Sequence, residues 1–323
     1  MQRILDPAQI EAFAQRSVPR LRFADPDHLF LQRARRLRHL SETSSVGGYL
    51  ALMATVCEGQ HRALAGWATR PQSSGPNPAE SRTRIARAQQ HDLPVLQALG
   101  WPRDAHWRVV LSQLCEEVAQ SAPSPVRLIC QQVAGASPAQ LEAEADRLLG
   151  SDIVGVDLEA APFVMAALQV YWVQMATALS AETTQALEVA QNRMAKSSMA
   201  GVCPVCGTLP VASIVRADAQ YQGYRYLHCA LCATEWHLVR IKCSHCLVTE
   251  GIRYHYLEGG SDAIRAESCE SCHAYRKILY QEKDPAVEPL ADDLGSLPVD
   301  LLMCAEKYHR ASGNPLLWQP ADL

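Results

Sequence analysis

The chain has 323 residues, of which 48% are hydrophobic and 20% charged, and its formal net charge at pH 7 is −4. This composition is typical of a globular protein with two or more domains and excludes a largely disordered chain. Residues 1–30 contain neither the apolar run nor the small-residue cleavage site of a secretory signal peptide. We therefore expect the protein to stay in the cytoplasm, where thiols remain reduced.

Residues 1–198 are predicted to form an α-helical, bundle-like domain, because apolar residues recur at helical spacing from Asp6 to about Lys196. Individual helices are expected after Asp25-Pro26-Asp27, over residues 46–68, around Trp107 to Val118, and from the capping box Ser137-Pro138-Ala139-Gln140 to Gly150. Residues 71–78, which are rich in proline and serine, are expected to form a loop.

Two features of this half require interpretation. A basic cluster of Arg33, Arg35, Arg36 and Arg38 lies on the first of these helices, and we interpret it as a solvent-exposed face. The segment Ala160–Ala181 carries no charge and is long enough to be considered as a membrane span. Its glutamines and its aromatic residues lie in the middle of the segment, whereas a span would place aromatic residues at the ends. We therefore predict a buried central helix and no membrane span.

The cysteines are the most informative residues of the chain. Eight of the twelve form four C-x-x-C pairs, and adding 40 to the positions of the first four gives the last four. In each half, 22 residues separate one pair from the next. The eight residues are Cys203, Cys206, Cys229, Cys232, Cys243, Cys246, Cys269 and Cys272.

Cysteines spaced i, i+3 can turn both sulfurs towards one point, and two such pairs supply four thiolates for Zn²⁺ or iron. We therefore predict two metal ions per chain, one held by the first four cysteines and one by the last four. The alternative is cross-bracing, in which the first and third pairs share an ion. Structural disulfides would need an oxidising compartment, and a thioredoxin-like redox pair would need a βαβ pattern that the sequence lacks.

The residues between the cysteine pairs are predicted to form two tandem metal ribbons, over residues 199–242 and 243–285. Their β-branched and aromatic runs indicate short strands. These strands are expected at residues 210–215, 224–227, 235–241, 252–256, 263–266 and 274–280. Residues 286–323 are predicted to form one amphipathic helix through Tyr308 and a tail that packs on the helical domain or across both domains.

The other cysteines and the histidines show no spacing typical of a functional site. We interpret Cys57, Cys115, Cys130 and Cys304 as small buried hydrophobic residues. His228, His245 and His273 stand beside the paired cysteines, but each predicted site already has four sulfurs, so we assign them no coordination.

A closed Cys₄ site has no open position for a substrate, and the sequence contains no nucleophile elbow, phosphate-binding loop or dinucleotide motif. We therefore do not expect an enzyme. Residues 199–285 contain nine basic and nine acidic residues, so the basic surface of a nucleic-acid binder is missing. A nucleic-acid-binding ribbon protein and a rubredoxin-like electron carrier are the alternative functions.

Several segments resemble the formate dehydrogenase accessory protein family, FdhE. They are Cys203-Pro-Val-Cys206-Gly207, Tyr226-Leu-His-Cys-Ala-Leu-Cys232, Thr234-Glu-Trp-His237, Arg240-Ile-Lys-Cys-Ser-His-Cys246, Ala266-Glu-Ser-Cys-Glu-Ser-Cys272 with Tyr275, Leu290-Ala-Asp-Asp-Leu294 and Asn314-Pro315-Leu316. The resemblance extends over essentially the whole chain.

This resemblance implies an α+β protein that acts as a maturation factor, binds the catalytic subunit of formate dehydrogenase in the cytoplasm and carries rubredoxin-like iron. Iron is thus favoured, with zinc as the alternative. The turn formed by a C-x-x-C pair is called a knuckle. In rubredoxin, a knuckle usually has glycine after its second cysteine. Here only Gly207 has that place, and Ala233, Leu247 and His273 follow the other three pairs.

Overall fold

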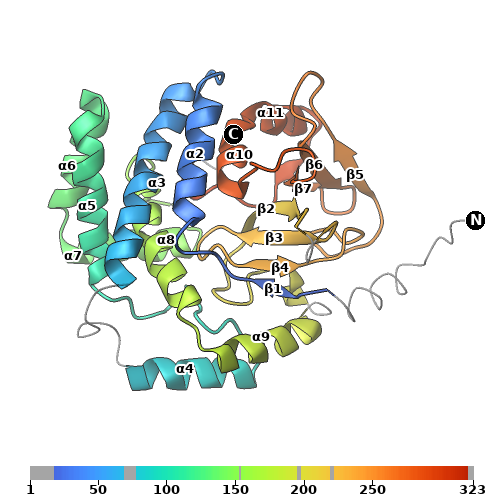
Figure 1. Ribbon diagram of the computed structural model, residues 1–323, viewed down its shortest axis with the longest axis horizontal. Coiled ribbons are helices and arrows are strands. Elements are labelled where there is room, and N and C mark those ends of the chain that lie inside the picture. The colour runs from blue at the N-terminus through green and yellow to red at the C-terminus, as the bar shows by residue number, and fades with distance from the viewer. Residues whose placement is uncertain (1–17, 69–77, 153, 195–197, 219–221, 319–323) are drawn as a thin grey trace, which may run out of the picture.

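The computed structural model describes residues 18–68, 78–152, 154–194, 198–218 and 222–318. Helices make up the N-terminal half and a sheet dominates the C-terminal half, and the two lie side by side (Figure 1). The helical pattern expected from Asp6 to residue 17 lies outside the described residues. So does the loop expected at residues 71–78, except for Pro78, which begins a helix.

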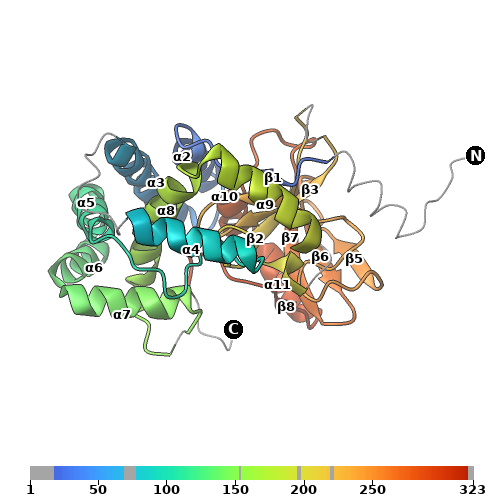
Figure 2. The ribbon, with the colours of Figure 1, turned by 90° about the horizontal axis from the view of Figure 1, so that it is seen from below.

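The helical half is built from helices packed in pairs. They are α2 (Leu29–Ser41), α3 (Gly47–Ala68), α4 (Pro78–Gln90), α5 (His106–Ser121), α6 (Ser124–Gly135), α7 (Pro138–Leu149), α8 (Ala161–Thr177), α9 (Ala181–Met194) and the short 3₁₀ helix η1 (Ser198–Gly201). The predicted capping box is present at the start of α7, where the Ser137 backbone N–H donates to Gln140 Oε1 at 2.9 Å. In the view from below, α4 and α9 lie next to each other across the middle of the molecule (Figure 2).

Helix α8 is the centre of the helical half, and it packs against α3, α5 and α7. Nearly all of its side chains are buried, which confirms the prediction of a buried helix. Gln169 fits this interior because it accepts a hydrogen bond from Gln60 at 2.9 Å and donates one to the Ala230 carbonyl at 2.7 Å. Among the described helices none alone meets the length and hydropathy of a membrane span, although α8 and α9 meet them together across a bend of 97°.

One mixed sheet contains the strands of both predicted ribbons. The strands are β1 (Leu21–Arg22), β2 (Pro210–Val215), β3 (Arg225–Cys229), β4 (Glu235–His237), β5 (Ile252–His255), β6 (Ile264–Cys269), β7 (Ala274–Tyr280) and β8 (His309–Arg310). Their order is β1-β4-β3-β2-β7-β6-β5, and β8 pairs with the beginning of β7. The strand predicted over residues 235–241 ends earlier, at His237.

The two ribbons join where β2 pairs with β7 in parallel, in the register Ser213 to Ile278. A buried ion pair supports this junction: Arg225 Nη1 on β3 lies 2.5 Å from both carboxylate oxygens of Glu267 on β6. The main hydrophobic core extends from the helical half through the first ribbon to Ile264 and Leu279 of the second, whereas Tyr275 packs in a small separate cluster with Met303.

The C-terminal segment corrects one prediction. It forms two short helices, α10 (Pro289–Gly295) and α11 (Leu297–Ala305), and Tyr308 lies beyond both. The break follows from Pro298, which has no N–H to donate to the carbonyl of residue 294. Helix α10 packs on α2 and β2, and α11 packs on β6 and β8.

The basic cluster on α2 provides a second correction, because Arg33 and Arg36 are buried. Arg33 Nε donates to Glu288 Oε1 at 2.9 Å, and Arg36 Nη2 donates to Asp292 Oδ1 at 2.6 Å. A cation enters a protein interior when a carboxylate compensates it, and these partners are more than 250 residues away in sequence. Arg35 and Arg38 are exposed as predicted.

Candidate metal centres

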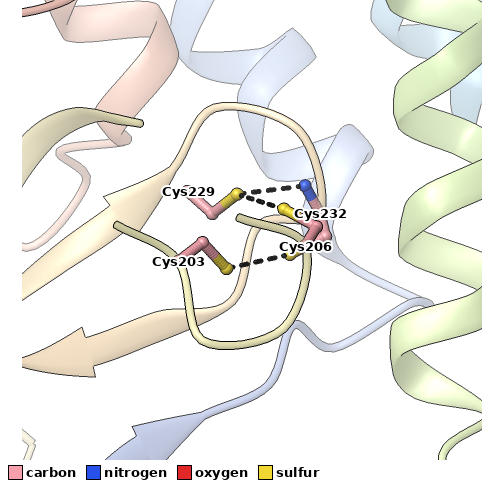
Figure 3. A group of neighbouring side chains, drawn as sticks. All are labelled: Cys203, Cys206, Cys229 and Cys232. Atoms are coloured by element: carbon pink, nitrogen blue, oxygen red, sulfur yellow. Dashed lines mark hydrogen bonds between the residues drawn. The ribbon is translucent and has the colours of Figure 1, made fainter. Parts of the chain in front are cut away.

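The first four paired cysteines meet between the helical half and the sheet (Figure 3). Cys203 and Cys206 lie in the turn between η1 and β2, Cys229 ends β3, and Cys232 lies in the turn before β4. The Sγ atoms of Cys203 and Cys232 are 3.6 Å apart, and those of Cys206 and Cys229 are 3.3 Å apart. All four side chains are buried.

The last four paired cysteines form a second group with the same plan. Cys243 and Cys246 lie in the turn before β5, Cys269 ends β6, and Cys272 lies in the turn before β7. The sulfurs of Cys243 and Cys272 are 3.8 Å apart, and those of Cys246 and Cys269 are 3.7 Å apart. The structure thus brings the sulfurs together in sequential groups and does not place the first and third pairs in one group.

All four knuckles share one backbone conformation. The residue after the second cysteine has a positive φ in each: 77° at Gly207, 57° at Ala233, 65° at Leu247 and 54° at His273. Three of these residues are not glycine, so the left-handed conformation costs them on the order of 1 kcal/mol or more each. Three knuckles therefore adopt this turn despite its energetic cost. Such a cost is expected where the turn is needed to place two sulfurs close together.

The donor set fits a metal ion. In each group the four sulfurs all lie within 4.8 Å of one another, and all eight are free thiols. A tetrahedral ion with metal–sulfur bonds of about 2.3 Å places its sulfurs roughly 3.8 Å apart. The closest sulfur pairs, which are 3.3 to 3.8 Å apart, approach this spacing. Each group could therefore hold one Zn²⁺ or one iron ion.

Hydroxyl groups distinguish the first group from the second. Thr208 Oγ1 lies 3.1 Å from the sulfurs of both Cys206 and Cys229, and Thr234 Oγ1 lies 3.2 Å from Cys232 Sγ. Each threonine is two residues after the second cysteine of its knuckle. At these positions the second group has Val248 and Ala274, which have no hydroxyl.

Sequence reasoning missed these threonines, although their identical offset was a usable signal. They also affect ionisation. Burial opposes ionisation of the Cys229 thiol, but hydrogen bonds from the three neighbouring thiols and Thr208 outweigh it and lower the pKa well below its usual range. Burial raises the pKa of both Cys203 and Cys232 well above its usual range, so among these three thiols only Cys229 is favoured as a thiolate.

A buried charge network lies behind the first group. Glu235 on β4 accepts hydrogen bonds from Arg216 Nε at 2.9 Å and pairs with His228 Nδ1 at 2.9 Å. Burial alone would raise the pKa of Glu235, but the charges of Arg216 and His228 and their hydrogen bonds lower it. His228 adjoins Cys229 in sequence, so this network fixes the end of β3 that carries Cys229.

The unpaired cysteines were interpreted as buried hydrophobic residues. Cys57, Cys115 and Cys130 are buried, as predicted, whereas Cys304 is exposed on α11. The prediction was wrong for Cys304 because α11 contacts the sheet over only part of its surface, with Val299 and Met303 buried and Leu301 exposed.

Comparison with known proteins agrees with this architecture. Family models described as the FdhE N-terminal, central and C-terminal domains match residues 18–188, 202–240 and 241–317. The chain belongs to the FdhE family. The FdhE homologue of Cronobacter sakazakii is 39% identical over 98% of this chain and 97% of its own length. That of Yersinia pestis is 38% identical over 94% of this chain and 92% of its own.

A solved FdhE structure shares the fold. The crystal structure of the FdhE protein from Pseudomonas aeruginosa matches with a TM-score of 0.75 and 32% sequence identity. The match covers 93% of this chain and 99% of that chain. The helical half, the mixed sheet and the ribbons of this chain therefore form the fold of an FdhE protein.

Proposed function

We propose that this protein is a maturation factor that binds the catalytic subunit of formate dehydrogenase in the cytoplasm and is required for that enzyme to become active. The family supports this proposal, because FdhE proteins are known as formate dehydrogenase accessory proteins. The match over nearly the full length of the relatives is the observation that carries it.

We also propose that the two Cys₄ groups hold the metal that this role requires. The first group contains Cys203, Cys206, Cys229 and Cys232, and the second contains Cys243, Cys246, Cys269 and Cys272. Iron is the metal favoured by the family resemblance, and zinc is the alternative. An iron ion would supply one-electron redox chemistry that zinc lacks.

A non-catalytic role is in keeping with the site chemistry. Four protein sulfurs complete a tetrahedral ion and leave no position for formate, so the groups suit structural support or electron exchange better than formate oxidation. An electron carrier remains the second candidate, supported by the partial exposure of residues Cys246 and Cys272. Nucleic-acid binding has less support, because the ribbons carry no excess of basic residues.

The test is formate dehydrogenase activity in cells that lack this protein and any redundant homologue. Wild type should restore activity, and Cys229→Ser/Cys232→Ser should not. Cys304→Ser is the matched control, because this exposed cysteine lies outside both groups and should restore activity fully. Normal activity in the deletion strain would overturn the proposed role. Rescue by the double variant would overturn only the requirement for the first group.

Binding is tested by capture of the catalytic subunit from cytoplasmic extract on the immobilised full-length protein. The proposal predicts that the catalytic subunit is retained and that free catalytic subunit competes. Activation of the enzyme in cells without any such complex would contradict the binding step while leaving the maturation role intact.

A further inference from the structure

The two Cys₄ groups differ in their contact with solvent. In the first group the exposed fraction is 0% for Cys203, Cys229 and Cys232 and 1% for Cys206. In the second group Cys246 and Cys272 are half-buried. An external ligand can therefore reach sulfur in the second group without prior unfolding, whereas the first group must open before it is reached.

The helical half covers the first group. The Leu96 N–H donates to the Val205 carbonyl at 2.7 Å, and the Ala98 N–H donates to the Cys206 carbonyl at 2.9 Å. The other knuckle is held by Gln169 of α8, which donates to the Ala230 carbonyl. Both knuckles of the first group are thus hydrogen-bonded to the helical half.

Exposed polar residues surround the second group. Within its knuckles His245, Glu270 and Ser271 are exposed, and His273 directly after Cys272 is exposed as well. The corresponding positions of the first group hold Val205, Ala230, Leu231 and Ala233, of which all but Ala230 are buried. The second group therefore faces solvent where the first faces the hydrophobic core.

Three exposed histidines lie within or next to the knuckles of the second group, and we call them the histidine rim: His245 inside one knuckle, His273 directly after Cys272, and His309 on β8, which pairs with the residues after His273. The ring centroids of His245 and His309 are 6.2 Å apart. The His309 N–H donates to the His273 carbonyl at 2.9 Å, so β8 holds this imidazole beside the knuckle. Neutral imidazole binds both zinc and iron.

We propose that the second Cys₄ group is an exchange site, where the metal ion enters and leaves past Cys246 and Cys272 with the histidine rim as transient ligands, while the first group keeps its ion. This inference rests on the proposal that both groups hold metal. In each exchange step one metal–sulfur bond breaks as one metal–nitrogen bond forms. The freed thiolate takes a proton from water, and the metal keeps its oxidation state.

The test is the release of zinc from the full-length protein loaded with two Zn²⁺ and mixed with the chromogenic chelator pyridylazoresorcinol. One ion per chain should leave at least about tenfold faster than the other, because only the first site needs local opening. Cys246→Ser/Cys272→Ser should remove the fast phase and keep the slow one, and Cys304→Ser should keep both. Equal rates for both ions, or a fast phase that persists in the double variant, would overturn the proposal.

A second measurement needs no cysteine variant. Brief treatment of the zinc-loaded wild type with N-ethylmaleimide and chelator, followed by peptide mass spectrometry, should label Cys246 and Cys272 before Cys206 and Cys232. Early labelling of the buried pair would contradict the assignment.

The triple variant His245→Ala/His273→Ala/His309→Ala tests the histidine rim. It should slow the fast phase of zinc release severalfold without changing the number of ions bound at the start, which is two. An unchanged fast rate would exclude a role for the rim.

These results separate the inference from the proposed function. Two ions that leave at equal rates would overturn the exchange site and leave the maturation role untouched. A protein that takes up no zinc or iron would overturn both the metal proposal and the exchange site. Formate dehydrogenase activity in the deletion strain reports on the maturation role independently.

Discussion

The two ribbons share the same spacing of cysteines but differ in the residues that surround their Cys₄ groups. The first ribbon contributes its knuckles to the main hydrophobic core and accepts hydrogen bonds from the helical half. The second turns its knuckles towards solvent and packs on the small α11. A repeated metal motif thus fixes local geometry, whereas the residues between the cysteines decide whether the site is part of the core.

Residues at equivalent positions of the two ribbons also differ in their interactions. Arg225 of the first ribbon is fully buried and pairs with Glu267, whereas Arg265, forty positions later, lies over the Tyr280 ring at 4.9 Å. His237 of the first ribbon corresponds to Lys277 of the second, a buried cation whose Nζ donates to Asp300 Oδ2 at 2.6 Å. At this position the first ribbon buries the imidazole of His237, whereas the second ribbon buries the ammonium group of Lys277 with a carboxylate partner.

The largest expected effect comes from disrupting each Cys₄ group in turn. Cys206→Ser/Cys232→Ser should prevent stable folding, because metal binding at such sites supplies on the order of 10 kcal/mol and this one lies in the core. Cys246→Ser/Cys272→Ser should keep the helical half and first ribbon folded with one ion. Circular dichroism and thermal unfolding of both variants check this, and equal loss of structure would remove the distinction between the ribbons.

The junction of the ribbons gives the next largest effect. Glu267→Gln leaves Arg225 buried without a charged partner, which should cost about 3–5 kcal/mol of unfolding free energy. Glu270→Gln makes the same change in the same ribbon at an exposed pair with Arg253 and should leave the denaturation midpoint unchanged. A midpoint unaffected by Glu267→Gln would mean that the two ribbons are not energetically coupled through this pair.

The stability of the first ribbon should also decrease at acidic pH. Burial, with the nearby charges of Arg20 and Arg225, lowers the pKa of His237 to about 3. The unfolded state takes up a proton near pH 6.5 and the folded state does not, so stability is full above that pH and is lost as the pH falls.

This histidine should account for about 2 kcal/mol of unfolding free energy lost between pH 7 and pH 5. His237→Asn keeps an acceptor for Arg20, which lies 3.1 Å from His237 Nδ1, but cannot take up the proton. Denaturant unfolding of wild type and variant at both pH values should show a smaller loss in the variant. Identical losses would contradict the assignment.

The smallest effect concerns the hydroxyl groups at the first centre. Thr208→Val gives the first ribbon the residue that Val248 provides in the second. It removes a hydroxyl donor that lies within reach of two sulfurs, which should weaken metal retention by about 1 kcal/mol and speed loss from the first centre severalfold. The slow phase of zinc release measures this, and the fast phase serves as an internal control.

Local patterns predicted much of this fold. The bounds of β2 and β7 followed from β-branched runs, and α7 followed from its capping box. The grouping of the eight cysteines followed from their spacing, because each 22-residue gap is long enough for a hairpin that returns its second knuckle to the first.

Features that depend on distant partners were not predictable. The burial of Arg33 and Arg36 requires carboxylates on the C-terminal segment, and the two-residue strands β1 and β8 exist only because longer strands offer free edges. The parallel junction pairs β2 with β7, which lie far apart in the sequence and are not the two arms of one hairpin. The difference in burial between the metal sites was nevertheless encoded, because Val205 and Leu231 stand where the second ribbon has His245 and Ser271.

We propose that eight thiols form two separate metal centres, and native mass spectrometry of protein purified without air can count the bound ions. We expect two metal ions on the wild-type chain and one on Cys246→Ser/Cys272→Ser, with the remaining ion on the first group. A metal-free chain whose mass shows the paired cysteines joined as disulfides would contradict it.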